Sequence, residues 1–190
     1  MIYTNFNDII ENNKKYEILV ADPPWSFKTY SKKNQDRAPE NHYQCMSWED
    51  LENMPIGEIS ADNAVLLMWC TDPLLAKQIV LPEKWGFTYK TVAFNWVKEN
   101  KKSKSLFFGL GYITRSNSEY CLYFTKGKPK RPKVRNILKV VIAKIREHSR
   151  KPDIIRDHID SMYDGAKIEL FARSSRAGWD SFGNEVDKFD

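Results

Sequence analysis

The sequence lacks any apolar run approaching the roughly 20 residues that a membrane-spanning helix requires. Its first segment, MIYTNFNDIIENNKKYE, does not follow the charged-then-apolar plan of a secretory signal. These two absences argue against a membrane protein and against a secreted one. The sequence therefore predicts a protein without a membrane partner.

Cysteine is scarce, because the 190 residues include only three: Cys45, Cys70 and Cys121. Their positions match neither a metal-ligand spacing nor a disulfide framework. Two of them lie in the apolar segments LLMWCT and EYCLYF, where a thiol is small core filling. Thiols without a disulfide framework are typical of a reducing compartment, so the sequence predicts a cytoplasmic protein with no metal site.

A G-x-G-x-x-G phosphate-binding fingerprint is also absent. The GLGY segment at 109–112 is too short to replace it and predicts a turn in a mobile loop. A nucleotide cofactor must therefore be held by other means.

Excess positive charge is modest, with a net charge of +5, and is concentrated in KENKKSKS at 98–105 and KGKPKRPKVR at 126–135. Both stretches can be solvated loops. Pro129 and Pro132 keep the second stretch out of a helix, and extended cations of this kind also suit a track along phosphates. Both interpretations of these stretches remain open.

Apolar segments of strand length alternate with helical patterns along the chain. Several of these segments lack alternation, which implies burial on both faces of a sheet. Helical patterns include SWEDLENM with Ser47 as N-cap, TDPLLAKQIVLPEKWG with Thr71 as cap and Gly86 as stop, and KPDIIRDHIDSMYDG. This order predicts one α/β domain over all 190 residues, with a mostly parallel sheet and helices on both faces. The predicted strands are 18–21, 64–70, 91–97, 120–125, 140–145 and 168–172.

The segment YEILVADPPWSF places an acid, two prolines and a tryptophan directly after the first of these strands. Ligands of such sheets bind beyond the carboxyl ends of strands, which is where Asp22 to Trp25 stand. A simple strand exit with Trp25 in the core explains the segment structurally. The chemical alternative is a pair of acceptors, the Asp22 carboxylate and the Pro23 carbonyl, beside an aromatic face. Pro24 would fix the direction of that carbonyl.

Such a pair of acceptors suits the exocyclic amine of adenine, whose lone pair is delocalised into the ring. Two acceptors engage its two hydrogens and favour a pyramidal nitrogen aimed at a methyl group on a sulfonium, and alignment accelerates the displacement. The carboxylate stabilises the positive charge that develops on the amine, and no metal is needed. A base inside a duplex must first be extruded, and stacking on an aromatic ring compensates part of that cost.

DPPW after an apolar strand resembles motif IV of the amino-methyltransferases that act on nucleic acids. Further segments follow in matching order: HYQCMSWEDL, VLLMWCT, WGFTYKTVAFNWVK, GLGYITRSNSEYCLYFTKGKP, HSRKPD, KIELFAR and GWDSFGNE. From about Tyr16 to Glu185 the chain therefore resembles the family of the eukaryotic messenger-RNA adenosine methyltransferase catalytic subunit, in the compact form of its bacterial and phage relatives. The resemblance implies a Rossmann-like class I methyltransferase fold with permuted motif order and S-adenosyl-L-methionine as cofactor.

Residue roles follow from the same resemblance. Asp22 and Pro23 would bind the target amine, and Pro24 and Trp25 would shape the pocket. The residues implied for the cofactor are Asp22, Ser149, Lys151, Glu169, Arg173, Asn184 and Glu185. Those implied for the target are Tyr43, Arg115, Asn117 and Glu119, and Glu119 is alternatively an anchor for its loop.

Within the cofactor set, Lys151 matches the family's ligand for the methionine carboxylate, and Arg173 lies at the nucleoside end. Asn184 and Glu185 would bind the ribose and adenine. Parity along a strand allows Glu169 and Arg173 to pair, and Phe171 is interpreted as packing. The chain departs from its eukaryotic relatives at Ser175 and Arg176, where they carry His-Asn, so that adenosine contact is not carried over.

Compact bacterial and phage relatives methylate adenine in DNA, so the resemblance implies DNA as substrate. RNA is the alternative, and a non-catalytic nucleic-acid-binding subunit is a third; the intact DPPW segment, Lys151 and Asn184 disfavour the latter. Protein amide methylation is disfavoured because such enzymes carry asparagine at the position of Asp22. The chain ends with the catalytic core, so target recognition is expected from loops 28–44 and 98–115, from 126–135, or from a homodimer or partner subunit.

Overall fold

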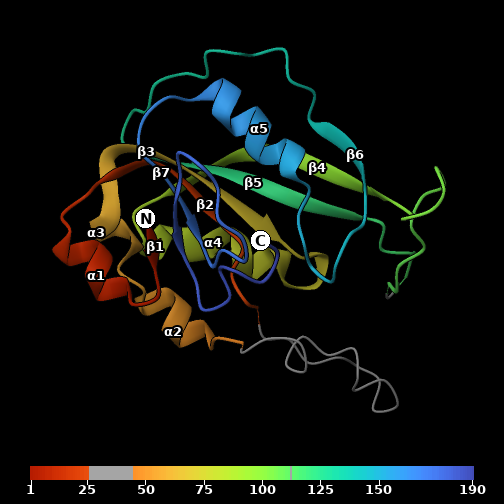
Figure 1. The fold of residues 1–190 in the computed structure, drawn as a ribbon, viewed down its shortest axis with the longest axis horizontal. Helices are drawn as coiled ribbons and strands as arrows, with labels where there is room; N and C mark the ends of the chain where they lie inside the picture. The colour runs from red at the N-terminus through yellow and green to blue at the C-terminus, as the bar shows by residue number, and fades with distance from the viewer. Residues whose placement is uncertain (26–44, 112) are drawn as a thin grey trace.

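The computed structural model describes residues 1–25, 45–111 and 113–190. Within these ranges one sheet contains eight strands in the order β1-β8-β7-β2-β3-β5-β4-β6 (Figure 1). Among the described strands, β5 runs antiparallel to both β3 and β4, whereas the other neighbours pair in parallel. The predicted mostly parallel sheet is therefore confirmed. The strands are β1 Ile2–Tyr3, β2 Tyr16–Ala21, β3 Ser60–Cys70, β4 Thr88–Glu99, β5 Ser118–Lys126, β6 Val140–Lys144, β7 Lys167–Leu170 and β8 Asp180–Phe182.

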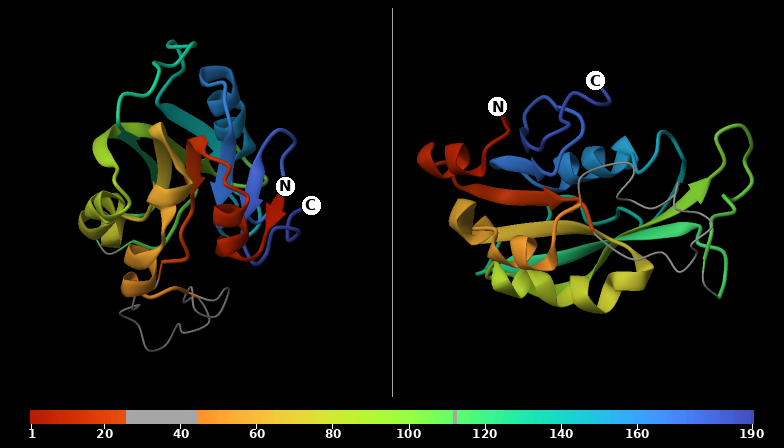
Figure 2. Two further views of the ribbon diagram at one scale, coloured as in Figure 1. Left: turned by 90° about the vertical axis from the view of Figure 1, so that its left-hand side faces the viewer. Right: turned by 90° about the horizontal axis from the view of Figure 1, so that it is seen from below.

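Helices cover both faces of this sheet, as predicted (Figure 2). Successive side chains of β2 point to opposite faces, so Leu19 packs in one apolar cluster and Ile18 in the other. The cluster around Leu19 includes side chains from the first four α-helices, and the cluster around Ile18 includes Ile155 and Ile159 of α5. The helices are α1 Phe6–Glu11, α2 Trp48–Asn53, α3 Ile56–Ile59, α4 Leu75–Lys84 and α5 Asp153–Met162.

The predicted local signals have mixed outcomes. Ser47 caps α2, since its side chain accepts the Asp50 N–H at 3.1 Å, and Gly86 follows α4 with a φ of 84°. Thr71 instead precedes a short 3-10 helix, Asp72–Leu74, and has no side-chain cap hydrogen bond. The strand predicted at 168–172 ends at Leu170, because Phe171 adopts a left-handed φ of 61°.

The direction of β5 brings two distant acids to one edge of the sheet. Asp22 follows the carboxyl end of β2, and Glu119 lies near the amino end of β5. Because β5 is antiparallel to its neighbours, its amino end meets the carboxyl ends of the parallel strands. The edge that the fold rule assigns to ligands therefore carries Asp22 and Glu119 together. None of the helices in the described ranges combines the length and the apolar character that crossing a membrane needs.

Candidate active site

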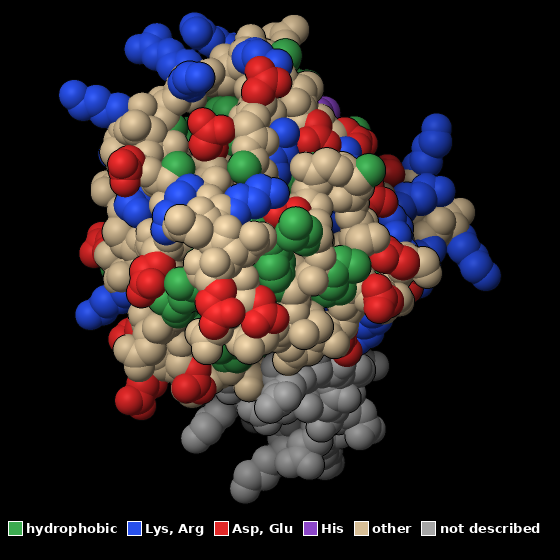
Figure 3. All heavy atoms as spheres, turned by 60° about the vertical axis from the view of Figure 1, so that its left-hand side comes forward, with side chains coloured by type: hydrophobic (Ala, Val, Ile, Leu, Met, Phe, Trp, Pro, Cys, Tyr) green, Lys and Arg blue, Asp and Glu red, His purple; other side chains and the backbone are tan. Residues whose placement is uncertain are grey.

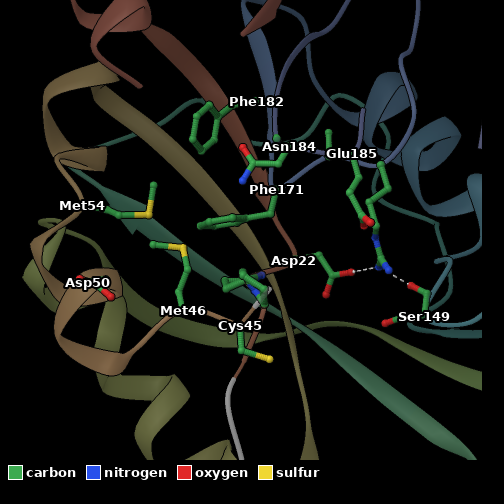
Figure 4. A pocket seen from close by; sticks show the side chains of 15 residues that line it. Asp22, Cys45, Met46, Asp50, Met54, Ser149, Phe171, Phe182, Asn184 and Glu185 are labelled. Atoms are coloured by element: carbon green, nitrogen blue, oxygen red, sulfur yellow. Dashed lines mark hydrogen bonds and ion pairs between the residues drawn. The ribbon is translucent and has the colours of Figure 1, made fainter. Parts of the chain in front are cut away.

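A cavity of about 570 Å³ opens at this edge, between the loop after β2, the segment leading into α2 and the segment after β8 (Figure 4). Its volume falls within the range of small-molecule and cofactor sites. It is lined by Asp22, Pro23, Pro24, Cys45, Met46, Asp50, Met54, Ser149, Phe171, Ala172, Arg173, Phe182, Gly183, Asn184 and Glu185. The predicted site residues Asp22, Pro23, Pro24, Ser149, Arg173, Asn184 and Glu185 are thus brought together.

The DPPW loop is fixed by main-chain hydrogen bonds. The Asp22 N–H donates to the Leu170 carbonyl of β7 at 3.3 Å, and the Trp25 N–H donates to the Pro23 carbonyl at 2.8 Å. The Pro24 carbonyl accepts the Met46 N–H at 3.1 Å. A carbonyl oxygen has two lone pairs, so Pro23 keeps capacity for a second donor. The loop therefore holds the carboxylate and this carbonyl in one fixed arrangement.

Trp25 does not form an exposed aromatic platform. Its side chain is 4% exposed and stacks on Trp48 of α2, with ring centroids 5.4 Å apart. The interpretation of Trp25 as a stacking face is therefore corrected, and the alternative of a core tryptophan after a strand exit describes it. Its side chain belongs to the apolar cluster that also contains Leu19 and Leu51.

Two cations hold the Asp22 carboxylate. Lys151 Nζ lies 3.0 Å from Oδ1 and 2.9 Å from Oδ2, and Arg173 Nη2 lies 3.0 Å from Oδ2. The Ser149 carbonyl accepts a second hydrogen bond from Arg173 Nη2 at 2.6 Å, as the dashed lines in Figure 4 mark. The three charged side chains are each only 15–16% exposed. Asp22, Lys151 and Arg173 thus form one shielded cluster, although 129 residues separate Asp22 from Lys151.

Glu119 extends this cluster towards β4. Its carboxylate lies 3.2 Å from Lys151 Nζ and 2.5 Å from Lys98 Nζ. Burial alone would lower the pKa of Lys151, but the carboxylates of Asp22 and Glu119 outweigh burial and raise this pKa above its usual value. Burial alone would raise the pKa of Glu119, but the positive charges of Lys151 and Lys98 outweigh burial and hold this pKa below its usual value. Lys151 is therefore a charged donor at neutral pH, and Glu119 joins the start of β5 to both Lys98 and Lys151. These contacts are in keeping with the predicted anchor, and the alternative contact of Glu119 with the target stays a prediction.

Glu169 faces α5. Its Oε2 accepts from Arg156 Nη1 at 3.0 Å, and Arg156 also contacts the Asp153 carboxylate and the Ser174 hydroxyl. The expected pairing of Glu169 with Arg173 along one strand is corrected, because β7 ends at Leu170 and Arg173 reaches Asp22 instead. Burial raises the pKa of Glu169 despite Arg156. Glu169 and Lys151 line a second, smaller cavity of about 30 Å³.

The contact between Glu169 and Arg156 predicts that both stabilise the fold. Arg156→Met is expected to lower the free energy of unfolding by about 3 kcal/mol, because it leaves a buried carboxylate without its cation. Combining it with Glu169→Gln should recover part of this loss, since the buried charge is removed. Thermal and urea unfolding measure both effects. Glu169→Gln alone should leave the affinity for S-adenosylhomocysteine within about twofold of wild type, and a larger loss of affinity would instead support the cofactor role.

Asn184 and Phe171 point into the cavity from neighbouring segments (Figure 4). Phe171 packs edge-on against Phe182, with ring centroids 6.1 Å apart, in keeping with the packing role predicted from the sequence. It also forms part of the cavity wall, which the sequence did not indicate. Glu185 is half-buried and pairs with Lys188 at 2.7 and 2.9 Å. This end of the cavity combines an amide and a carboxylate with an aromatic wall.

The described residues among those predicted for the target, Arg115, Asn117 and Glu119, do not line this cavity. Tyr43 lies outside the described residues. Arg115 is exposed with its guanidinium 4.3 Å from the Phe108 ring centroid, and the Asn117 carbonyl accepts the Lys98 N–H at 2.8 Å. Both belong to the loop between β4 and β5.

The basic stretch 126–135 lies at the opposite edge of the sheet from Asp22. It begins at Lys126, the last residue of antiparallel β5, whose Nζ donates to the Gly57 carbonyl at 2.9 Å. It then passes the end of α5, where the Lys133 N–H donates to the Met162 carbonyl at 2.9 Å (Figure 1). Of the two basic stretches predicted for target recognition, 98–105 lies at the end of the sheet where the cavity opens, and 126–135 does not.

Besides Phe171, interpreted as packing, seven lining residues are not among the predicted site residues. Three of them, Ala172, Phe182 and Gly183, lie within two residues of Arg173 or Asn184. The other four are Cys45, Met46, Asp50 and Met54. Asp50 belongs to α2, and the other three flank it. The sequence of α2 indicates a helix and its N-cap, but no local pattern shows which side chains of this segment face a pocket. The available signal is that HYQCMSWEDL, at 42–51, is the next family segment in the sequence after DPPW.

Comparison with known proteins identifies relatives across most of the chain. The MT-A70 family matches residues 16–185. Type II methyltransferase M.MunI of a Mycoplasma species is 35% identical over 190 residues, covering 91% of this chain and 78% of that protein. The N(6)-adenosine-methyltransferase MT-A70-like protein of Arabidopsis thaliana is 32% identical, over 90% of this chain and 24% of its own length. Human N(6)-adenine-specific methyltransferase METTL4 is 27% identical, over 95% of this chain and 39% of its own length.

The family match confirms the ancestry that the DPPW segment and its accompanying motifs predicted, the Rossmann-like fold class and the prediction of an adenine methyltransferase enzyme. It covers the DPPW loop, Lys151, Arg173 and the segment after β8. The chain belongs to the MT-A70 family of methyltransferases.

Proposed function

We propose that this protein transfers a methyl group from S-adenosyl-L-methionine to the N6 amine of adenine in DNA, as a single domain in the cytoplasm. The observation that carries the proposal is that Asp22 and Pro23, held by the main-chain hydrogen bonds of the DPPW loop, both line the cavity. Relatives named N(6)-adenosine- and N(6)-adenine-specific methyltransferases support adenine as the acceptor. The buried thiols of Cys70 and Cys121, which form no disulfide, are in keeping with a reducing compartment.

DNA is favoured over RNA because the sequence motifs resemble the bacterial and phage members of the family, which the resemblance associates with DNA. Type II methyltransferase M.MunI of a Mycoplasma species, at 35% identity, supports the likeness to this group. The relatives named as adenosine methyltransferases make the same reaction on RNA the second candidate.

The polar groups of the cavity fit the proposed cofactor. Arg173 lines this cavity, and Lys151 lines the smaller one that shares Asp22 and Arg173 with it. Both are shielded cations suited to the carboxylate of the cofactor, and the Ser149 carbonyl orients Arg173. This assignment moves Arg173 from the nucleoside end, which the resemblance implies, to the carboxylate end, because Arg173 shares Asp22 with Lys151.

Asn184 and Glu185 offer an amide and a carboxylate to a ribose diol and a purine, and the cavity volume of about 570 Å³ suits a ligand of this size. When bound, the cofactor supplies an electrophilic methyl group on a sulfonium.

The contacts of Asp22 assign different roles to its two oxygens. Oδ2 accepts from both Lys151 and Arg173, whereas Oδ1 accepts from Lys151. We therefore assign Oδ1 to one hydrogen of the target amine and the Pro23 carbonyl to the other. In this position the carboxylate stabilises the positive charge that develops on the nitrogen. The two cations fix the orientation of the Asp22 carboxylate.

The test is methyl transfer to both polymers in parallel. The purified protein is incubated with labelled S-adenosylmethionine and either amplified DNA free of methylated adenine or an RNA transcript of the same sequence. Digestion to nucleosides and mass spectrometry should identify N6-methyl-2′-deoxyadenosine. Label confined to the RNA would refute the DNA assignment. Normal cofactor binding without transfer to either polymer would favour a non-catalytic binding subunit.

A further inference from the structure

The loop between β4 and β5 forms a basic turn, residues 100–105, and a finger, residues 107–116, of which all but 112 are described. The Asn100 side chain donates to the carbonyls of Ser105 and Leu106 at 3.3 and 3.1 Å, which closes the basic turn. The Phe107 N–H donates to the Lys98 carbonyl at 2.8 Å, which fixes the start of the finger. Both project from the end of the sheet, as the green loop in Figure 1 shows.

Two glycines make the finger narrow. A Cβ atom at Gly109 would lie 2.0 Å from the Ser116 carbonyl oxygen, and one at Gly111 would lie 1.8 Å from the Thr114 carbonyl oxygen. No side chain fits at these approaches, so the two sides of the finger require glycine where they meet. The GLGY segment, which matches no cofactor fingerprint, therefore has a structural role here.

The described part of the finger exposes three large apolar side chains. Phe108 is 70% exposed, Leu110 63% and Ile113 85%. The Arg115 guanidinium lies over the Phe108 ring at 4.3 Å from its centroid. Apolar side chains gathered on one projecting segment mark an interaction site.

The charge around the finger indicates the partner. Lys101, Lys102 and Lys104 of the basic turn are all exposed, and the sequence contains no acid between Glu99 and Glu119. Figure 3 shows that Lys and Arg side chains project at separate places on the edge of the molecule instead of forming one continuous basic face on the side in view. Cations beside apolar side chains suit a duplex, in which phosphates attract the former and the base stack accepts the latter.

The finger also begins beside the catalytic cluster. Lys98, at its base, contacts Glu119 at 2.5 Å, and Glu119 contacts Lys151, which holds Asp22. Two ion pairs thus connect the base of the finger to the side chain that holds the catalytic carboxylate.

We propose that the finger is a wedge for duplex DNA: Phe108, Leu110 and Ile113 enter the base stack beside the target adenine and occupy the space that it leaves, while the basic turn contacts the phosphates. This inference rests on the proposed DNA methyltransferase activity. It assigns extrusion of the target to a segment outside the cavity.

The test compares native duplex DNA with single-stranded DNA of the same sequence. The triple variant Phe108→Ser, Leu110→Ser and Ile113→Ser should lose at least about tenfold in methyl transfer to the duplex, because the wedge compensates unstacking. Transfer to the single strand should stay within about twofold of wild type, because a single strand needs no extrusion. The matched control, Leu138→Ser with Ile142→Ser, removes exposed apolar side chains from the β6 region and should lower neither rate.

A second variant separates phosphate binding from wedging. Replacing Lys101, Lys102 and Lys104 by alanine should weaken binding to both DNA forms. For the duplex, the slope of log affinity against log salt concentration should become shallower by about 0.9 for each phosphate that the variant no longer neutralises. The ratio of duplex to single-strand transfer should change less than in the apolar variant.

Each result decides one question. If wild-type protein methylates neither DNA form, the proposed function fails. If wild type methylates both and the apolar variant loses nothing, or loses equally on both, the wedge is refuted. A variant that changes the oligomeric state, measured by light scattering, would identify the finger as a protein contact and also refute the wedge.

Discussion

Asp22→Asn is expected to lower the rate of methyl transfer about a thousandfold while cofactor binding is retained. The asparagine keeps the size of the side chain but removes the charge that stabilises the developing cation on the target amine. It leaves Lys151 with Glu119 at 3.2 Å and Arg173 with the Ser149 carbonyl at 2.6 Å, so the cofactor cations keep their positions. Single-turnover transfer and calorimetric titration with S-adenosylhomocysteine measure the two effects separately.

The control for Asp22 is Asp8→Asn, which neutralises an exposed acid on α1 and should leave both rate and affinity unchanged. Circular dichroism confirms that each variant is folded. A rate for Asp22→Asn within about tenfold of wild type would show that the carboxylate is not the group that stabilises the transition state.

The sequence predicts the sheet well where strands are long and apolar. Segments 64–70 and 120–125 lie within β3 and β5, whose buried side chains repeat over several residues. β1 and β8 were missed because two or three residues carry no measurable period. β8 also begins with two buried polar residues, Asp180 and Ser181. Asp180 is tolerated there because it accepts from Tyr16 and Lys14, which no local pattern reveals.

The site is predictable as a set of residues but not as a set of contacts. Family motifs identify Asp22, Lys151 and Arg173, yet their mutual ion pairs join segments separated by 129 and 151 residues. Strand parity predicts that Arg173 pairs with Glu169, and this prediction is wrong because the left-handed Phe171 ends the strand. The sequence also leaves open whether the Trp25 ring is exposed or buried. Trp48 covers this ring, and no local pattern predicts that the two residues meet. Local patterns define elements, whereas these contacts depend on how the elements meet.

Lys151→Met is expected to weaken cofactor binding about a hundredfold, because it removes the buried cation proposed for the cofactor carboxylate. It should also lower the free energy of unfolding by about 3 to 5 kcal/mol at pH 7, since Asp22 and Glu119 then lose a shared partner in a shielded site. Lys151→Arg keeps the charge and should lose less of both. Titration calorimetry and urea unfolding provide the measurements.

The loss of stability in Lys151→Met should depend on pH in a defined direction. Burial raises the pKa of Glu119, but Lys151 and Lys98 hold it below its usual value. A lowered carboxyl pKa stabilises the fold at pH values above the unfolded pKa of about 4.3, and this contribution is lost as the pH falls through the folded pKa. The gap in unfolding free energy between wild type and Lys151→Met should therefore be widest near neutral pH and narrow as Glu119 becomes protonated. An equal gap in neutral and acidic buffer would mean that Lys151 stabilises the fold by packing and not by its charge.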